Sequence, residues 1–452
     1  MNNNHINTLI EHAICATDQE IHSILKKSRN FEGLTPAEVA ALLCTKDPVH
    51  IQQIYEIAGN VKEQIYGDRV VMFAPLYVSD YCVNQCNYCG FKHEQTFGRK
   101  RLSMDALREE VRILERMGHK RLALEAGEDP VNCPIEYILE CIRTIYDTKL
   151  IRRVNVNIAA TTVENYKKLK EAGIGTYILF QETYHQETYE HMHPKGPKSN
   201  FDYHYTAFDR ALEAGLDDVG GGVLFGLYDY RYEVLGLMLH NAHLEEKFGV
   251  GFHTISVPRV CPITPDTPVS EAYDYAVDDE TFKKIVAIIR LAVPFTGMIM
   301  STRESAEMRR DCIALGISQI SGGSTVEVGG YALGIEGASQ FELADNRSAK
   351  DIIFWMMEEG LLPSFCTACY RTGRTGDRFM SLAKTGNIKN VCLPNALLTL
   401  KEYALDYGDE EFRKLAYGLI SKKITDIEDN TLRSSITQKL QRLEAGERDL
   451  FI

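Results

Sequence analysis

The middle of the chain alternates between short apolar segments and longer amphipathic segments, and this alternation constrains the fold more than any other feature. The short segments are typical of strands, and the longer ones repeat apolar residues at helical spacing. The expected strands are residues 71–78, 121–125, 153–159, 176–182, 219–225, 251–257, 297–301 and 317–320. Strands that alternate with helices over about 250 residues predict an α/β fold, a parallel (β/α)8 barrel of the TIM type. The carboxyl ends of its strands would form one common mouth, where we expect the active site.

Both flanks of this barrel are predicted to be helical. The expected units are an N-terminal helical extension (1–65), the barrel (66–340) and a small C-terminal helical domain (341–452). Within the last unit, residues 348–359 and 393–446 have helical patterns. A loop rich in glycine and arginine, residues 370–378, lies between these two segments.

Charge and composition argue against several classes of protein. The net charge of −13 disfavours nucleic acid or an anionic membrane surface as the main partner. No stretch approaches the ~20 apolar residues of a membrane-spanning helix, and the N-terminus lacks a signal-peptide pattern. The twelve cysteines are therefore expected to be reduced thiols or metal ligands instead of disulfides. We expect a cytoplasmic, oxygen-sensitive enzyme.

Three cysteines directly follow the first expected strand. Cys82, Cys86 and Cys89 have C-x3-C-x2-C spacing. Iron–sulfur clusters are normally held by four thiolates, so three thiols on one loop can hold a 4Fe–4S cluster and leave one iron open to a small molecule. The alternatives are structural thiols or a Cys3His zinc site with His93, although structural zinc ligands more often come as two separated pairs.

A second set of three cysteines lies in the C-terminal domain. Cys366, Cys369 and Cys392 have C-x2-C-x22-C spacing. A structural zinc site would need a histidine as fourth ligand, but the sequence has none from residue 254 to its end. A second 4Fe–4S cluster with an open position fits this set better.

Polar residues at the ends of the expected strands are candidates for ligand binding. Asn157 on the third strand and Glu182 on the fourth need partners, because burying an unpaired polar group costs ~1–3 kcal/mol. A bound ribose or amino acid would supply them. Arg303, after the seventh strand, suits a carboxylate clamp. The alternative is an ion pair with Glu304 or Asp311.

Two histidine motifs need separate treatment. His191-Met192-His193-Pro194 lies in a polar loop, where we expect solvated side chains without a metal role. His253 lies on the sixth strand, and strand alternation places it on one face with Ile255 and Val257. Because these two are typical barrel-interior residues, we expect that face to point inward. His253 is then either a hydrogen-bonded core residue or an iron ligand.

Several motifs together resemble a known family. The cysteine loop, with Tyr88 before its last cysteine, resembles the radical S-adenosylmethionine (SAM) superfamily. Over residues 60–410 the chain resembles the HydG family of tyrosine-cleaving FeFe-hydrogenase maturases. The motifs that carry this resemblance are the cysteine loop, Glu182-Thr183-Tyr184-His185, residues 224–230, residues 253–259 and the C-terminal C-x2-C-x22-C.

The resemblance implies a set of SAM-binding residues. Gly127 and Glu128 match the Gly-Glu pair that contacts the SAM amine. Residues 222–229 resemble the adenine-contacting G-x-I-x-G-x-x-E pattern, from which Leu224 and Asp229 are departures. Arg210, on the helix after the fourth strand, suits the SAM carboxylate; a surface arginine is the alternative. The full expected set is Tyr88, Gly127, Glu128, Asn157, Glu182, Arg210 and Leu224.

The resemblance also implies the reaction. The 5′-deoxyadenosyl radical formed at the cluster of Cys82, Cys86 and Cys89 would cleave L-tyrosine to p-cresol and dehydroglycine. Dehydroglycine would become carbon monoxide and cyanide at the second 4Fe–4S cluster, which carries an additional iron for the hydrogenase active site. Its expected ligands are Cys366, Cys369, Cys392 and His253, and the expected catalytic residues are Arg303, Ser301 and His253.

The implied partners are a low-potential electron donor such as ferredoxin or flavodoxin and other hydrogenase maturation proteins. Neither nucleic acid nor a membrane is expected. Two other functions stay open at this point. One is a thiazole-type 2-iminoacetate synthase, which cleaves tyrosine without making carbon monoxide. The other is an iron–sulfur carrier without catalytic activity.

Overall fold

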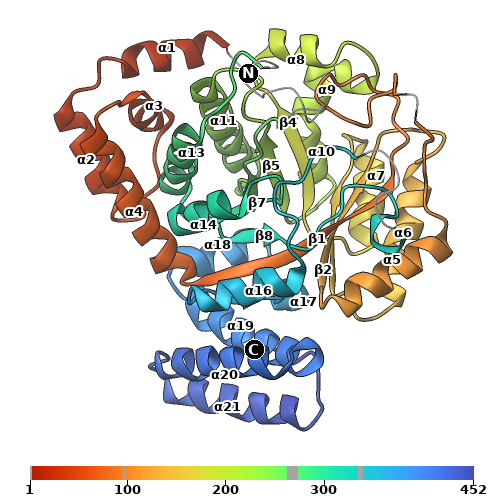
Figure 1. Ribbon diagram of the computed structural model, residues 1–452. Helices are drawn as coiled ribbons and strands as arrows, with labels where there is room; N and C mark the ends of the chain where they lie inside the picture. Colours follow the sequence, from red (N-terminus) through yellow and green to blue (C-terminus); the bar gives the residue numbers. More distant parts are fainter. Residues whose placement is uncertain (1–2, 96, 262–272, 334–338) are drawn as a thin grey trace.

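The computed structural model describes residues 3–95, 97–261, 273–333 and 339–452, and its centre is a closed parallel barrel (Figure 1). The sheet order β2-β3-β4-β5-β6-β7-β8-β1 closes because β1 also pairs with β2. The predicted (β/α)8 barrel is therefore confirmed. Its strands are β1 (Arg69–Ser79), β2 (Arg121–Ala126), β3 (Arg153–Asn157), β4 (Tyr177–Glu182), β5 (Val219–Val223), β6 (Thr254–Ser256), β7 (Gly297–Met300) and β8 (Gln319–Ser321).

Helices surround the barrel in the expected places, with one difference. Between β4 and β5, where a single helix over 203–214 was predicted, the chain forms several short elements. Residue Thr206 interrupts the expected helix. The helices around the barrel are α5 (Met104–Arg116), α6 (Ile135–Asp147), α7 (Val163–Glu171), α8 (Gln186–Met192), the 3-10 turn η1 (Pro197–Ser199), α9 (Phe201–Tyr205), α10 (Ala207–Glu213), α11 (Tyr230–Phe248), α13 (Asp279–Ala292), α14 (Ala306–Leu315) and α15 (Gly330–Leu333).

The N-terminal helices lie on one side of the barrel (red to orange in Figure 1). They are α1 (Asn3–Ala13), α2 (Asp18–Ser28), α3 (Pro36–Cys44) and α4 (Pro48–Tyr66). Thr17 and Thr35 each form a capping box with a glutamate three residues later, which satisfies free amides at the starts of α2 and α3. Helix α4 packs against α13 and α14 and leads directly into β1.

The C-terminal part contains a strand that the sequence did not predict. β9 (Leu362–Ser364) pairs in parallel with the first residues of β1, Arg69–Val71. Strand β1 therefore joins β9 at its amino end and delivers the first cysteine loop at its carboxyl end. The helices of this part are α16 (Ala349–Glu358), α17 (Ala368–Arg371), α18 (Gly376–Lys384), α19 (Ile388–Tyr407), α20 (Glu410–Thr425) and α21 (Asn430–Glu444). Helices α17 and α18 replace much of the expected loop.

The inward face of β6 differs from the prediction. Ser256 lines the interior cavity, whereas Ile255 is fully buried in the apolar core and lines none of the cavities described below. A Cβ atom on Gly297 would lie 3.1 Å from Thr254 Cγ2 and 2.8 Å from Gln319 Nε2, so Thr254 also points inward. The predicted common inward face of His253, Ile255 and Val257 is wrong for Ile255, whereas Val257 lines the interior cavity and His253 lines a cavity at the amino end of the barrel. Both faces of a parallel barrel strand are buried, so hydrophobicity does not identify the inner one.

Among the described residues, no helix is both long enough and apolar enough to span a membrane.

Candidate functional site

The first cysteine loop leaves the carboxyl end of β1 and is held by many backbone contacts. The guanidinium of Arg99 donates to three carbonyl oxygens around the loop, those of Asp80 (2.6 Å), Phe91 (2.9 Å) and Lys92 (2.6 Å). The amide of Val83 donates to the carbonyl of Glu128 at 2.8 Å. These contacts attach the loop to the end of β2, where Gly127 and Glu128 lie.

The three thiols of this loop line one cavity of about 120 Å³, which we call the cluster-loop cavity. Burial raises the pKa of the Cys89 thiol to about 11 and also raises that of Cys86. Such thiols need a bound cation to become thiolates, and a coordinating metal provides one. The residues lining this cavity include Tyr77, Cys82, Asn84, Cys86, Tyr88, Cys89, Glu125, Gly127, Glu128, Asn157, Glu182, Lys198 and His204.

His93, the candidate fourth zinc ligand, does not join the thiols. Its side chain is exposed and does not line the cavity. Its Nδ1 lies 3.3 Å from the carbonyl oxygen of Cys82. The donor set at this cavity is therefore three thiols, which fits a 4Fe–4S cluster with one open iron better than a Cys3His zinc site.

Three of the expected SAM contacts border the same cavity in constrained conformations. A Cβ atom on Gly127 would lie 2.4 Å from the carbonyl oxygen of Tyr81, so this position needs glycine. Glu128 accepts a hydrogen bond of 2.6 Å from Asn84 Nδ2, and burial raises the pKa of Glu128. Glu182 has φ of 69°, a left-handed conformation that costs of order 1–3 kcal/mol and is found most often at functional sites.

The remaining expected SAM residues divide into two groups. Tyr88, Asn157 and Leu224 line the interior cavity described below, and Tyr88 and Asn157 also line the cluster-loop cavity. Arg210 lines neither. Its guanidinium donates to Thr161 O (2.9 Å), Thr206 Oγ1 (2.8 Å) and Tyr203 O (2.6 Å). These three bonds occupy its donors in the region of α7 and α10, away from both cavities.

A half-buried lysine stands where Arg210 was expected. Lys198 lines the cluster-loop cavity, and its Nζ lies 2.7 Å from Glu182 Oε1. The pKa of Lys198 is raised, because the attraction of Glu182 outweighs the cost of burial. Nothing in the sequence pattern indicates this role, since a lysine in a polar loop is ordinarily exposed.

Residues 191–198, which were expected to be solvated, instead pack against the cysteine loop. His193 is only 1% exposed, and its Nε2 lies 2.7 Å from the hydroxyl of Tyr88. His191 is exposed as expected, but its carbonyl accepts from Asn87 Nδ2 at 3.0 Å. The expectation is therefore wrong for His193, because the loop folds back over the cysteine loop.

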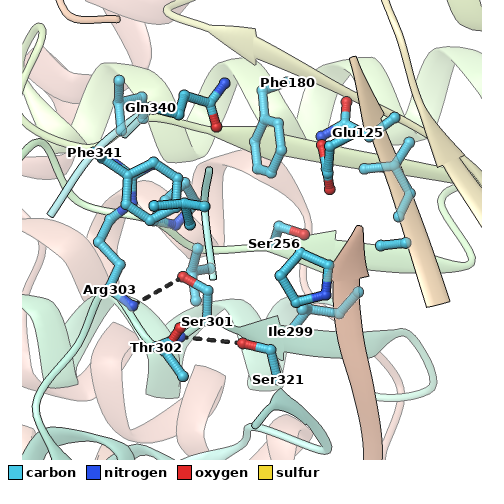
Figure 2. A pocket seen from close by; sticks show the side chains of 18 of the residues that line it. Glu125, Phe180, Ser256, Ile299, Ser301, Thr302, Arg303, Ser321, Gln340 and Phe341 are labelled. Atoms are coloured by element: carbon cyan, nitrogen blue, oxygen red, sulfur yellow. Dashed lines mark hydrogen bonds between the residues drawn. The ribbon is translucent and has the colours of Figure 1, made fainter. Parts of the chain in front are cut away.

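The interior of the barrel holds a cavity of about 150 Å³, which we call the barrel cavity (Figure 2). A cavity of this size can accommodate an aromatic ring. Polar groups from several strand ends face it, and Figure 2 shows Glu125 and Arg303 on opposite sides of it. Its polar lining residues are Tyr77, Tyr88, Cys89, Glu125, Asn155, Asn157, Glu182, Ser256, Ser301, Thr302, Arg303, Gln319, Ser321 and Gln340.

Arg303 keeps an unpartnered donor for an anionic ligand, although its Nη1 donates to the carbonyl of Arg259 at 3.3 Å. Its guanidinium carbon lies 3.6 Å from the centre of the Phe341 ring, and its buried Nε has no partner among the described residues. Its backbone amide donates to Ser301 Oγ at 3.3 Å. The carboxylate of Glu304 pairs with Arg259 instead, at 2.9 Å from Nε. Asp311 lies near Arg310 and Lys283, so the ion pair proposed as an alternative for Arg303 does not form within the described residues.

Glu125 is a polar residue of the barrel cavity that the sequence analysis did not select. Its accessible surface faces the barrel and cluster-loop cavities. Burial raises its pKa well above the usual range, and a hydrogen bond from Asn157 opposes this shift. Period-two alternation from Gly127 on the same strand could have identified it as inward-facing.

The second set of cysteines lies at the opposite, amino-terminal end of the barrel. Cys366 follows β9, Cys369 lies in α17 and Cys392 in α19. With His253 they line a cavity of about 60 Å³, which we call the lower cavity. Several of its other lining residues begin barrel strands: Arg69, Arg121, Gly297 and Gln319.

The surroundings of the lower cavity favour a thiolate at Cys392, whereas burial raises the pKa of Cys366, and the hydrogen bond to Cys392 together with burial raises that of Cys369. A hydrogen bond from Cys369 lowers the pKa of Cys392, and Arg69 and Arg374 lower it further. Burial lowers the pKa of His253, whose Nδ1 lies 3.4 Å from Asp218 Oδ1 without forming a hydrogen bond. A neutral imidazole beside three thiols is a donor set that suits iron. Arg69, Arg121 and Arg374 each have a buried Nε without a partner in the described part of the chain, and the sequence analysis missed all three.

The barrel cavity and the lower cavity share one lining residue. Gln319 lines both the barrel cavity and the lower cavity.

None of the twelve cysteines, all of which lie in the described ranges, forms a disulfide. Both thiol sets are therefore free to bind metal.

Comparison with known proteins gives a consistent result. The radical SAM superfamily matches residues 76–237, and the biotin and thiamin synthesis associated domain matches residues 256–362. The chain is similar to a crystal structure of HydG, a maturase of the FeFe-hydrogenase, with 56% identity and a TM-score of 0.97, covering 100% of this chain and 99% of that one. It is also similar to HydG from Carboxydothermus hydrogenoformans, with 37% identity and a TM-score of 0.83, covering 97% and 100%. The 2-iminoacetate synthase of Escherichia coli strain K12 is 28% identical over 75% of this chain and 89% of its own length.

Proposed function

The chain belongs to the HydG family of FeFe-hydrogenase maturases, and on this premise we propose that it cleaves L-tyrosine and converts one fragment to carbon monoxide and cyanide. The products of the first step are p-cresol and dehydroglycine. The observation that carries the proposal is the pair of three-thiol sites, one at each end of the barrel. A tyrosine lyase needs only the site at the barrel mouth.

At the mouth, Cys82, Cys86 and Cys89 would hold a 4Fe–4S cluster whose open iron binds SAM. When bound, the cluster supplies the electron that cleaves SAM and provides the radical for tyrosine cleavage. Gly127, Glu128, Asn157, Glu182, Leu224 and Tyr88 would contact SAM, as the sequence analysis predicts. We assign the SAM carboxylate to Lys198, because it is a half-buried cation that lines this cavity and Arg210 is occupied elsewhere.

In the barrel cavity, Arg303 would bind the tyrosine carboxylate, with Ser301 beside it. The guanidinium has a free donor, and stacking on Phe341 fixes its plane. The phenol ring suits the size of the cavity. The enclosing strands exclude water, which protects a reactive intermediate from side reactions.

At the lower cavity, Cys366, Cys369 and Cys392 would hold the second 4Fe–4S cluster, and His253 would bind the additional iron. Arg69, Arg121 and Arg374 would balance the negative charge of thiolates and anionic ligands. Gln319 lines both the barrel cavity and the lower cavity, which supports passage of the fragment through the barrel interior to this end. We further propose a cytoplasmic enzyme that takes electrons from ferredoxin or flavodoxin and delivers its product to other hydrogenase maturation proteins.

One experiment separates this function from the two alternatives. The anaerobically reconstituted protein is given SAM, L-tyrosine and a reductant, and p-cresol and carbon monoxide trapped on haemoglobin are both measured. We expect both products. The formation of p-cresol without carbon monoxide would identify a 2-iminoacetate synthase. The absence of SAM cleavage would identify a carrier.

A further inference from the structure

Residues 191–198 form a clamp over the first cysteine loop, and we call them the clamp segment. The amides of Gln85 and Asn87 donate to the carbonyls of Lys195 (3.1 Å) and Met192 (3.0 Å). The amide of Lys198 donates to Asn84 Oδ1 at 2.9 Å. The cysteine loop is therefore held on this side by a segment more than a hundred residues away in sequence.

Among the described residues of the clamp segment, only the side chain of His193 forms a hydrogen bond with Tyr88, the aromatic residue of the cysteine loop. His193 Nδ1 lies 2.7 Å from the carbonyl oxygen of Tyr189. A carbonyl can only accept, so Nδ1 carries the proton. In the neutral ring, Nε2 is then an acceptor, and the Tyr88 hydroxyl donates to it at 2.7 Å. The two rings meet edge to face at 83°.

The position of Tyr88 gives this hydrogen bond a consequence for the reaction. Tyr88 lines both the cluster-loop cavity and the barrel cavity, so its ring forms part of the boundary between them. A phenol ring with a free hydroxyl can rotate about its side-chain bonds, whereas a hydrogen bond to a buried acceptor fixes one rotamer. Any change in this rotamer would alter both cavities together.

We infer that His193 is a positioning residue that holds Tyr88 between the SAM site and the substrate site, so that SAM cleavage is coupled to tyrosine cleavage. This inference rests on the proposed function. His193 is not itself a lining residue of either cavity, so it acts through Tyr88. The sequence contains the clue in His191-Met192-His193-Pro194, but nothing in the sequence distinguishes the buried histidine from the exposed one.

The test uses variants from both sides of the hydrogen bond. His193→Phe removes the acceptor and keeps a ring of similar size, and Tyr88→Phe removes the donor. For the reconstituted protein we expect unchanged iron content, SAM binding weakened about five- to tenfold, and several-fold more deoxyadenosine per p-cresol. The double variant should show no further loss, because both changes remove the same interaction. SAM binding is measured at equilibrium, independently of turnover.

Two further variants separate positioning from mere folding. In His193→Gln the amide oxygen can accept the Tyr88 hydrogen bond, so coupling should recover substantially. His191→Phe is the matched control, because that ring is exposed on the same segment, and it should behave like the unmodified protein. If His193→Phe fails to fold, Tyr88→Phe still tests the same hydrogen bond.

Several outcomes would overturn the inference. Unchanged SAM affinity and unchanged coupling in Tyr88→Phe would show that the hydrogen bond positions nothing. Loss of iron in His193→Phe, without recovery in His193→Gln, would show that His193 only maintains the cysteine loop. If the unmodified protein binds SAM but forms no p-cresol, the proposed function has failed instead, and the binding data still report on the hydrogen bond.

Discussion

At the scale of single residues, unpartnered polar groups identify the sites more sharply than residue type does. Arg303 and Arg210 were both expected to bind carboxylates. Arg210 satisfies its donors with Thr161, Thr206 and Tyr203. Arg303 retains a buried Nε without a partner in the described ranges and faces the barrel cavity. Buried polar groups are normally paired, so an unpartnered donor that also faces a cavity is a candidate ligand contact.

Replacement of Arg303 by lysine should weaken tyrosine binding. Arg303→Lys keeps the positive charge but loses the planar, two-pronged donor geometry. The loss of one hydrogen bond to a charged group corresponds to roughly a tenfold to hundredfold rise in the tyrosine KM, while SAM cleavage without tyrosine persists. Arg310→Lys, at an exposed position on α14, is the control. A tyrosine KM that stays the same in Arg303→Lys would refute the clamp.

At the scale of elements, the sequence predicted the number and order of barrel strands, but it did not predict for every strand which face points inward. The alternation of strands and helices depends on chain-wide periodicity, which the sequence contains. The inward face of β6 depends on which of two buried faces meets the cavity, and Ile255 shows that an apolar side chain does not decide this. β9 has three residues, including Pro363, and pairs with β1 only through tertiary contact. So short a segment carries no periodic signal.

The turn between α5 and β2 contains a buried histidine at the junction with the C-terminal helices. His119 is 0% exposed, and neither ring nitrogen has a partner in the described structure. The turn is covered by α19, because a Cβ atom on Gly118 would lie 2.1 Å from the Tyr403 ring. The Tyr403 hydroxyl donates to the carbonyl of Met117 at 3.2 Å. A charge on His119 would therefore be trapped at this contact.

Acid should destabilise this junction through His119. Burial lowers the pKa of His119 from 6.5 to about 4, so the unfolded chain binds this proton more tightly than the folded one. Protonation of His119 does not reduce the free energy of unfolding above pH 6.5. Between pH 6.5 and 4 it lowers the free energy of unfolding by about 3 kcal/mol. In His119→Phe, the thermal midpoint should therefore fall less between pH 6.5 and 4 than it does in the unmodified protein. His12→Phe, at an exposed position on α1, should not. Parallel curves for His119→Phe and the unmodified protein would contradict this assignment.

At the scale of the whole molecule, the barrel has a cavity lined by three cysteines at each end. The active sites of TIM-type barrels lie at the carboxyl face, and the opposite face ordinarily serves stability. Here β9 and α17–α19 cover the amino face and bring three thiols to His253. The sequence predicted both cysteine sets and their membership. It could not predict that the C-terminal part would join the amino end of the barrel, because this depends on the pairing of β9 with β1.

This arrangement predicts that the two chemical steps can be separated by mutation. Cys366→Ser with Cys369→Ser removes two of the three thiols at the lower cavity and leaves the barrel mouth intact. Iron in the reconstituted protein should fall to about half, as expected for loss of one of two clusters. p-Cresol should persist, because the proposed tyrosine site beside Arg303 lies at the other end, whereas carbon monoxide should fall below a tenth of its usual yield. Cys15→Ser with Cys44→Ser is the control, because these thiols line neither site. Equal loss of p-cresol and carbon monoxide would show that the two ends of the barrel do not work separately.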